Sequence, residues 1–319
     1  MLNFLRSNSP LYNFFLSVIL IPLFIFNHYY SSTESELIWP ILNLIKTNKI
    51  ALYLIYSCII FITSIRINLI INKSIFFEKS NYSSGILYLF FMGLSGMIHL
   101  AILPAIGNLF VVFSLENFFK IFRNKPCKIE IFNASCFLII SCFFYAYNIF
   151  LLPILWLVLY FIRPFNWREY VMPIIALIFI SVYLLPFGYF NNYLNTWVTI
   201  WWNYSKINNL DNFIEWGFLL FSICLGLLIG LSTLIFTFIK SNNRYKKIAW
   251  VILSLFFLCL IQLIISKLYL NIQYPLLFTI LLPLSILLAN SIINSKYSWL
   301  VGSYLVILVI VKLIISFVL

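Results

Sequence analysis

Residues 248–268 read IAWVILSLFFLCLIQLIISKL, an apolar run in which Lys267, near the end, is the only charged residue. An α-helix rises about 1.5 Å per residue, so a run of this length crosses the roughly 30 Å hydrocarbon core of a bilayer. Similar runs recur along the chain, which is 64% hydrophobic and only 9% charged, with a mean hydropathy of +1.05. No soluble domain of ordinary size buries this much apolar surface. The sequence therefore predicts an all-α, polytopic integral membrane protein.

About 11 transmembrane helices are expected in a single integral membrane domain covering residues 1–319. Two stretches, 85–122 and 131–162, must each fold back through a tight turn, the first broken at Pro104 and Gly107 and the second near Tyr147–Asn148. The first run is interpreted as an uncleaved span, because no small-residue cleavage site follows it. The apolar runs lie at 11–30, 50–72, 85–103, 107–122, 131–146, 148–162, 168–187, 214–239, 248–268, 274–293 and 298–317.

Charge indicates the orientation of these helices. With the N-terminus inside, 15 of the 20 lysines and arginines fall on the inner side. Cytoplasmic loops carry such an excess of basic residues, so we predict an N-in, C-out topology. The net charge of +12 is then a topology signal, and membrane lipids, not nucleic acid, are the expected partners.

The first outer segment, 31–49, contains the candidate catalytic residues Glu34 and Glu36. A carboxylate there is suited to act as a general base on an acceptor hydroxyl. It is also suited to bind a divalent cation together with a lipid-linked phosphate, although no motif supports a metal site or any cofactor. The alternative is that both residues are solvated first-turn residues of a helix lying along the membrane surface.

Ionisable residues inside or near the ends of spans are candidate substrate-binding residues, because an unpaired charge in a membrane is costly. Arg66 and Glu116 lie about a turn from the inner face, where snorkelling to the surface is the alternative. His99 lies deeper, and a hydrogen bond between helices would equally account for it. Lys267, together with Tyr274, lies near the outer face and is suited to meet a phosphate head group. The alternative is that Lys267 anchors its helix at the membrane surface.

The second outer segment, 188–213, is rich in aromatic residues, including Trp201 and Trp202. These side chains are suited to stack on sugar rings, or to form the aromatic belt found at membrane surfaces. Five of the six cysteines lie inside apolar runs and no C-x-x-C occurs, so the sequence indicates neither a zinc site nor a disulfide framework. Sequence signatures of soluble enzymes are also missing.

Residues 163–170 read RPFNWREY and form the most distinctive inner loop. Pro164 ends one span, and Asn166 with Glu169 has the spacing of a capping box for the next. With the paired short spans before it, this loop resembles a family of polytopic membrane proteins of unknown function from Bacteroidota. The likeness covers nearly the full chain. This resemblance implies a multi-pass protein of the bacterial inner membrane. It implies no particular activity, because none is established for the family.

The order of features also resembles the C-type glycosyltransferases, which use polyprenyl-phosphate sugars and place an acidic motif in the first outer loop. Glu34-Ser35-Glu36 occupies that place here, and the segment from Lys267 to Pro283 is similar to the stretch that contacts the lipid phosphate. The chain departs from that pattern, since the acidic pair lacks Asp and no soluble outer domain is present.

Three functions therefore remain open. The leading hypothesis is cell-envelope glycan assembly, in which a membrane glycosyltransferase or polysaccharide polymerase uses a polyprenyl-linked sugar on the outer face. The alternatives are a transporter of lipid-linked glycans and a non-enzymatic scaffold of an envelope complex. The sequence identifies neither the donor and acceptor nor any protein partner.

Overall fold

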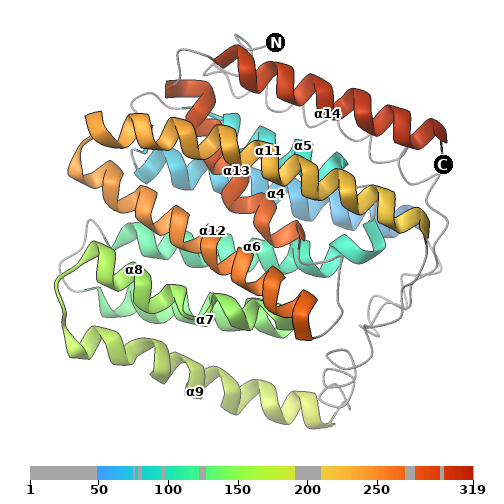
Figure 1. Ribbon diagram of the computed structural model, residues 1–319. Helices are drawn as coiled ribbons and strands as arrows, with labels where there is room; N and C mark the ends of the chain where they lie inside the picture. The colour runs from blue at the N-terminus through green and yellow to red at the C-terminus, as the bar shows by residue number, and fades with distance from the viewer. Residues whose placement is uncertain are drawn as a thin grey trace.

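The computed structural model describes residues 49–74, 76–77, 81–94, 98–121, 127–190, 210–269, 277–294 and 298–318 (Figure 1). Every regular element within these ranges is a helix, which confirms the all-α prediction there. The first expected span, 11–30, lies outside the described residues. In chain order the helices are α4 (Lys49–Ser74), α5 (Ser83–Leu94), α6 (Ile98–Lys120), α7 (Lys128–Phe144), the 3₁₀ helix η1 (Ala146–Leu151), α8 (Ile154–Ile162), α9 (Trp167–Phe190), α11 (Leu210–Lys240), α12 (Asn243–Tyr269), α13 (Leu277–Asn294) and α14 (Ser298–Val318).

Four helices contain stretches that are long and apolar enough to cross a membrane, by length and composition. They are Leu54–Ser74 in α4, Ile102–Lys120 in α6, Leu220–Ile239 in α11 and Asn243–Ile265 in α12. Large apolar side chains such as Ile178 and Phe179 of α9 are exposed at the periphery. Such a surface is unfavourable in water and suits contact with lipid. The described part of the chain is thus a helical bundle with membrane-spanning capacity.

Basic residues gather at one end of this bundle. The end of α6, the end of α8 and the start of α12 meet there, because Arg163 Nη2 donates to the Ile121 carbonyl and Lys247 Nζ to the Ile162 carbonyl, each at 2.9 Å. We call this the basic end, and the opposite one the far end. The basic end carries Lys73, Lys120, Lys128, Arg163, Arg168, Lys240, Arg244, Lys246 and Lys247.

Helix α13 forms the centre of the bundle. Its residues from Phe278 to Ile292 are all buried, and it packs against α5, α6, α11, α12 and α14 (Figure 1). Gly230 lets α11 approach closely, because a Cβ at that position would lie 3.1 Å from the Cβ of Leu287. Small residues serve this purpose in membrane bundles, where helices associate by close packing.

The expected break at Pro104 and Gly107 is wrong. Helix α6 runs without interruption through both residues, and α5 ends earlier, at Leu94. A membrane helix tolerates proline because neighbouring groups satisfy the backbone carbonyl that the ring leaves without a donor. Gly107 instead permits a close contact, since a Cβ there would lie 2.8 Å from Asn148 Nδ2 and 3.1 Å from Tyr145 Cβ. The predicted spans 85–103 and 107–122 are therefore α5, of 12 residues, and a longer α6.

The expected interruption of 131–162 is confirmed, slightly earlier than predicted. Tyr145 is extended, with φ −133° and ψ 96°, and separates α7 from η1. Pro153 then precedes α8, where its fixed φ suits the start of a helix. The predicted span 148–162 is consequently a 3₁₀ segment followed by a short α-helix.

The RPFNWREY loop forms half of the expected capping box. The Asn166 side chain accepts a hydrogen bond from the Arg168 backbone N–H at 3.3 Å and so caps α9. The Glu169 carboxylate turns away from the cap and accepts a hydrogen bond from Arg163 Nη1 at 3.4 Å. The remaining predicted runs, 50–72, 168–187, 214–239, 248–268, 274–293 and 298–317, lie over α4, α9, α11, α12, α13 and α14.

Candidate functional site

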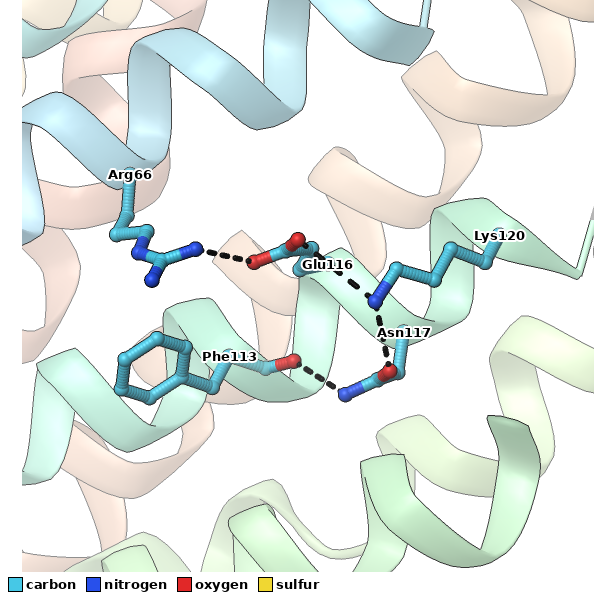
Figure 2. A network of polar contacts seen from close by, with 5 residues as sticks. All are labelled: Arg66, Phe113, Glu116, Asn117 and Lys120. Carbon is cyan, nitrogen blue, oxygen red and sulfur yellow. Dashed lines mark hydrogen bonds and ion pairs between the residues drawn. The ribbon is translucent and has the colours of Figure 1, made fainter. Parts of the chain in front are cut away.

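An ionic cluster joins α4 to α6 towards the basic end (Figure 2). Arg66 Nη1 lies 3.4 Å from Glu116 Oε2, and Lys120 Nζ lies 3.7 Å from Glu116 Oε1. The Arg66 guanidinium also lies over the Phe113 ring, 5.2 Å from its centroid. Asn117 donates to the Phe113 carbonyl at 3.0 Å and accepts from Lys120 at 3.2 Å. We call Arg66, Phe113, Glu116, Asn117 and Lys120 the Arg66 cluster.

The Arg66 cluster carries two cations and one carboxylate, so a net positive charge remains. The side chains of Arg66 and Lys120 are 42% and 51% exposed. Arg66 lies eight residues before the end of α4, about 12 Å along the helix. A guanidinium at that depth is suited to bind a phosphate through its planar donors. The cluster is therefore a candidate contact for an anionic lipid head group.

The basic end is held together by three cation contacts. Arg163 bonds Glu169 of α9 and also the Ile121 carbonyl beyond α6, while Lys247 bonds the Ile162 carbonyl of α8. Cations suit the negative ends of helices, where the last carbonyls lack partners. Next to them lies the buried thiol of Cys127, whose pKa is raised to about 12 by burial and, to a lesser extent, by its hydrogen bond with Glu169. These contacts hold the ends of α6, α8, α9 and α12 together and therefore have a structural role.

A buried polar network ties α11, α12 and α13 together near the same end. Tyr245 Oη donates to Asn290 Oδ1 at 2.8 Å and lies 3.0 Å from Thr237 Oγ1. Asn294 Nδ2 also donates to Asn290 Oδ1 at 2.8 Å, and the Phe76 ring stacks on Tyr245 with centroids 4.6 Å apart. Each of these polar groups has a partner, so the network positions helices and offers no unfilled group.

Towards the far end, polar groups contact the start of α13. Asn108 Nδ2 of α6 donates to the Phe278 carbonyl at 3.0 Å. The next carbonyl, that of Thr279, loses its helical donor because Pro283 has no N–H, and Cys259 Sγ of α12 lies 3.8 Å from it. Side chains of α6 and α12 thus meet the first turn of α13.

Two further carboxamides, Gln262 of α12 and Asn148 of η1, are fully buried on helices that pack together. Both Gln262 side-chain atoms and Asn148 Oδ1 lack hydrogen-bond partners. We call Asn108, Asn148 and Gln262 the amide level. Sequence reasoning missed these residues, although a lone Gln within the apolar run 248–268 was a signal, because intramembrane polar groups need partners.

Only some of the predicted site residues lie in the described part of the chain. Arg66 and Glu116 are brought together as an ion pair. The expectation that His99 lies deep within a span is wrong, because His99 is the second residue of α6, at the far end. Lys267 lies in the last turn of α12, at the same end, and the side chains of both residues lie outside the described atoms. The other predicted site residues lie outside the described part of the chain: Glu34, Glu36, Trp201, Trp202 and Tyr274.

Within the described ranges, no group of three or more His, Cys, Asp or Glu residues lies close enough together to hold a metal ion. All six cysteines are free thiols. Comparison of the chain with protein-family models, with curated proteins and with solved structures found no match.

Proposed function

We propose that this is a multi-pass bacterial inner-membrane protein of about 11 transmembrane helices that transfers or polymerises a polyprenyl-linked sugar on the outer face of the membrane. The observation that carries the proposal is the charge difference between the two ends of the bundle. Nine basic residues of the described helices and loops lie at the basic end, together with three acidic ones, Glu116, Glu130 and Glu169. The far end carries three basic residues, Lys49, Lys267 and Lys312, and two acidic ones, Asp211 and Glu215. The positive-inside rule then makes the basic end cytoplasmic.

This orientation favours glycan chemistry at the far end. Helix α4 begins at the far end, and the proposal takes residues 31–48, which contain Glu34 and Glu36, as the outer segment that precedes it. Lys267, near the end of α12, belongs to the same side. An acidic segment and a cation on one side are what a transferase requires, because it must activate an acceptor and hold a phosphate.

The proposed reaction is a substitution at the sugar. One carboxylate, Glu34 or Glu36, takes the proton of an acceptor hydroxyl. The acceptor oxygen then forms a bond to the anomeric carbon, and the bond from that carbon to the phosphate oxygen breaks. Polyprenyl phosphate leaves with the electron pair, stabilised by Lys267. The resemblance to C-type glycosyltransferases supports these roles.

Replacement of the two carboxylates tests this proposal. Glu34→Gln and Glu36→Gln should each reduce the amount or length of the surface glycan in a strain that depends on this protein. Glu215→Gln is a matched control, because it removes a far-end carboxylate to which no role is assigned. Unchanged glycan in both test variants, with normal protein levels, would remove the catalytic proposal and favour the scaffold alternative.

A second candidate, transport of a lipid-linked glycan, is favoured by the Arg66 cluster. Its ion pair lies at a depth where charges are costly, and its cations are partly exposed. In this proposal Arg66 binds the lipid phosphate from the cytoplasmic side, and His99 lies further along the path. Movement of a fluorescent polyprenyl-phosphate sugar across proteoliposomes, lost in Arg66→Met and His99→Ala, would establish transport. No movement with the wild-type protein would exclude it.

A further inference from the structure

Two buried carboxamides have unfilled hydrogen-bonding atoms. Gln262 is 0% exposed, and neither Nε2 nor Oε1 has a partner. Asn148 is also 0% exposed; its Nδ2 donates to Ser141 Oγ at 3.2 Å, and its Oδ1 has no partner. Roughly nine in ten buried polar groups in proteins are paired. Three amide atoms on two neighbouring helices are therefore available to hydrogen-bond a further group.

The helix register places the two amides at the same depth. Lys247 bonds the Ile162 carbonyl, and the Phe161 ring stacks on Trp250 at 5.6 Å, so these positions of α8 and α12 are level. From Ile162 back to Asn148 the chain rises about 23 Å through α8 and η1. From Lys247 on to Gln262 it rises about 22 Å in the same direction.

The start of α13 lies beside this level. Cys259 Sγ lies 3.8 Å from the carbonyl of Thr279, the third residue of α13. Gln262 follows Cys259 by three residues, so it lies on the same face of α12, one turn closer to the far end. Its carboxamide therefore lies beside the N-terminal end of α13, where backbone N–H groups lack helical partners.

Helix α6 also lies next to this level. Asn108 Nδ2 donates to the carbonyl of Phe278, next to Thr279. A Cβ on the adjacent Gly107 would lie 2.8 Å from Asn148 Nδ2, so η1 is in close contact with α6 at this depth. Three separate contacts thus bring α6, η1, α12 and the start of α13 to one level.

We propose that Gln262 and Asn148, beside the N-terminal end of α13, bind hydroxyl groups of a sugar. This inference rests on the proposed function, because it names the sugar portion of the polyprenyl-linked substrate as the ligand. A carboxamide offers both donors and an acceptor, and a pair of sugar hydroxyls fills both. Asn108, Asn148, Cys259 and Gln262 carry no formal charge, so the site favours a neutral ligand over a phosphate, whose burial without a cation is costly.

Photolabelling of the full-length protein in lipid nanodiscs tests the site. The probes are alkyl glucoside, galactoside, mannoside and N-acetylglucosaminide, each with a diazirine on the first alkyl carbons, and the matching sugar-free alcohol. At least one glycoside should label peptides containing residues 146–151 or 258–265 five-fold more than the alcohol does. Unlabelled glycoside should compete, and an alkyl phosphate of the same chain length should not.

The variant Gln262→Met removes both polar atoms and keeps a similar shape, so labelling should fall at least five-fold while the melting temperature stays equal or rises. A purely structural glutamine would show the reverse, a lower melting temperature with unchanged labelling. Ser254→Ala is the matched control on α12, because its hydroxyl bonds the Val251 carbonyl of its own helix at 2.8 Å. It should leave labelling unchanged.

Several outcomes would overturn the inference: equal labelling by the sugar-free alcohol, no sugar-dependent labelling by any glycoside, labelling that survives Gln262→Met, or stronger competition by the alkyl phosphate. These results are independent of the glycan phenotype. Sugar-dependent labelling with normal glycan in Glu34→Gln and Glu36→Gln would retain the site and reject the catalytic roles. If Glu34→Gln and Glu36→Gln lose the glycan but the wild-type protein shows no sugar-dependent labelling, the catalytic roles are retained and the sugar site is rejected.

Discussion

The carboxamide of Asn108 on α6 donates a hydrogen bond to the backbone carbonyl of Phe278 on α13, with an Nδ2–O distance of 3.0 Å, across 170 residues of sequence. The same nitrogen lies 3.4 Å from Tyr88 Oη of α5. One side chain thus links the central helix of the bundle to two helices that precede it in the chain. Because Phe278 is buried, water cannot replace this hydrogen bond if the Asn108 side chain is removed.

Asn108→Leu should lower the free energy of unfolding by about 1–2 kcal/mol, since it leaves buried acceptors without this donor. Reversible unfolding in mixed micelles measures the change. Asn117→Leu is the control, because the Asn117 amide donates within its own helix, to the Phe113 carbonyl. Equal losses in both variants would show that the link to α13 adds no stability.

Gly85→Ala should destabilise the protein by about 1–3 kcal/mol, the usual cost of overpacking. A Cβ at Gly85 would lie 2.5 Å from the Ser64 backbone carbonyl and would overlap the Asn68 side chain, so α5 must move away from α4. Gly217→Ala on α11 meets nothing within 4 Å and should be neutral or stabilising, as alanine favours helix more than glycine. Thermal unfolding of the two variants measures the contrast. A stable Gly85→Ala protein would contradict the close crossing of α4 and α5.

The pair of Arg66 and Glu116 should show a coupling energy of roughly 1 kcal/mol in a double-mutant cycle of Arg66→Met and Glu116→Gln. Arg66 is partly exposed, which limits the value, whereas Glu116 is largely buried. The Glu116 variant alone should be the less stable single mutant, because it leaves Arg66 and Lys120 without their shared carboxylate. Additive effects of the two mutations would show that the 3.4 Å contact contributes nothing.

Cys127 should react with maleimide at pH 8 at least tenfold more slowly than a cysteine placed at the neighbouring position by Ile129→Cys. Burial raises the pKa of Cys127 to about 12, so the thiol stays protonated at pH 8, and the thiolate is the reactive form. Ile129 is 73% exposed, so a cysteine there should react at an ordinary rate. Mass spectrometry of the labelled peptides compares the two sites. Similar rates would contradict the burial of Cys127 against Glu169.

The same raised pKa predicts a loss of stability in alkali. An unfolded cysteine ionises near pH 9, whereas the folded Cys127 does not ionise until about pH 12. Above pH 9 the unfolded state therefore binds fewer protons than the folded state, and its free energy falls. Cys127→Ala should remove part of the decrease in unfolding free energy between pH 9 and pH 11. An unchanged pH profile in that variant would contradict the shift.

The two expected helix breaks, near Asn148 and at Pro104, show which local patterns predict the fold and which do not. The interruption near Asn148 was predictable, because polar and aromatic residues precede Pro153 within an apolar stretch. The continuity of α6 through Pro104 was not, because a proline ends a helix in water but is tolerated where neighbouring helices satisfy the backbone. Gly107 has the same ambiguity, since glycine permits both turns and close packing.

The sequence by itself determined the helical membrane class and the segregation of basic residues to one end, because hydropathy and charge are sums over a segment and need no knowledge of its neighbours. Only the tertiary structure decided that Arg66 faces Glu116, that α13 occupies the centre, and that the Gln262 carboxamide and Asn148 Oδ1 lie at one depth without hydrogen-bond partners. Such pairings depend on which helix faces meet at which depth. Residues 50 or more positions apart carry no local signal of that choice.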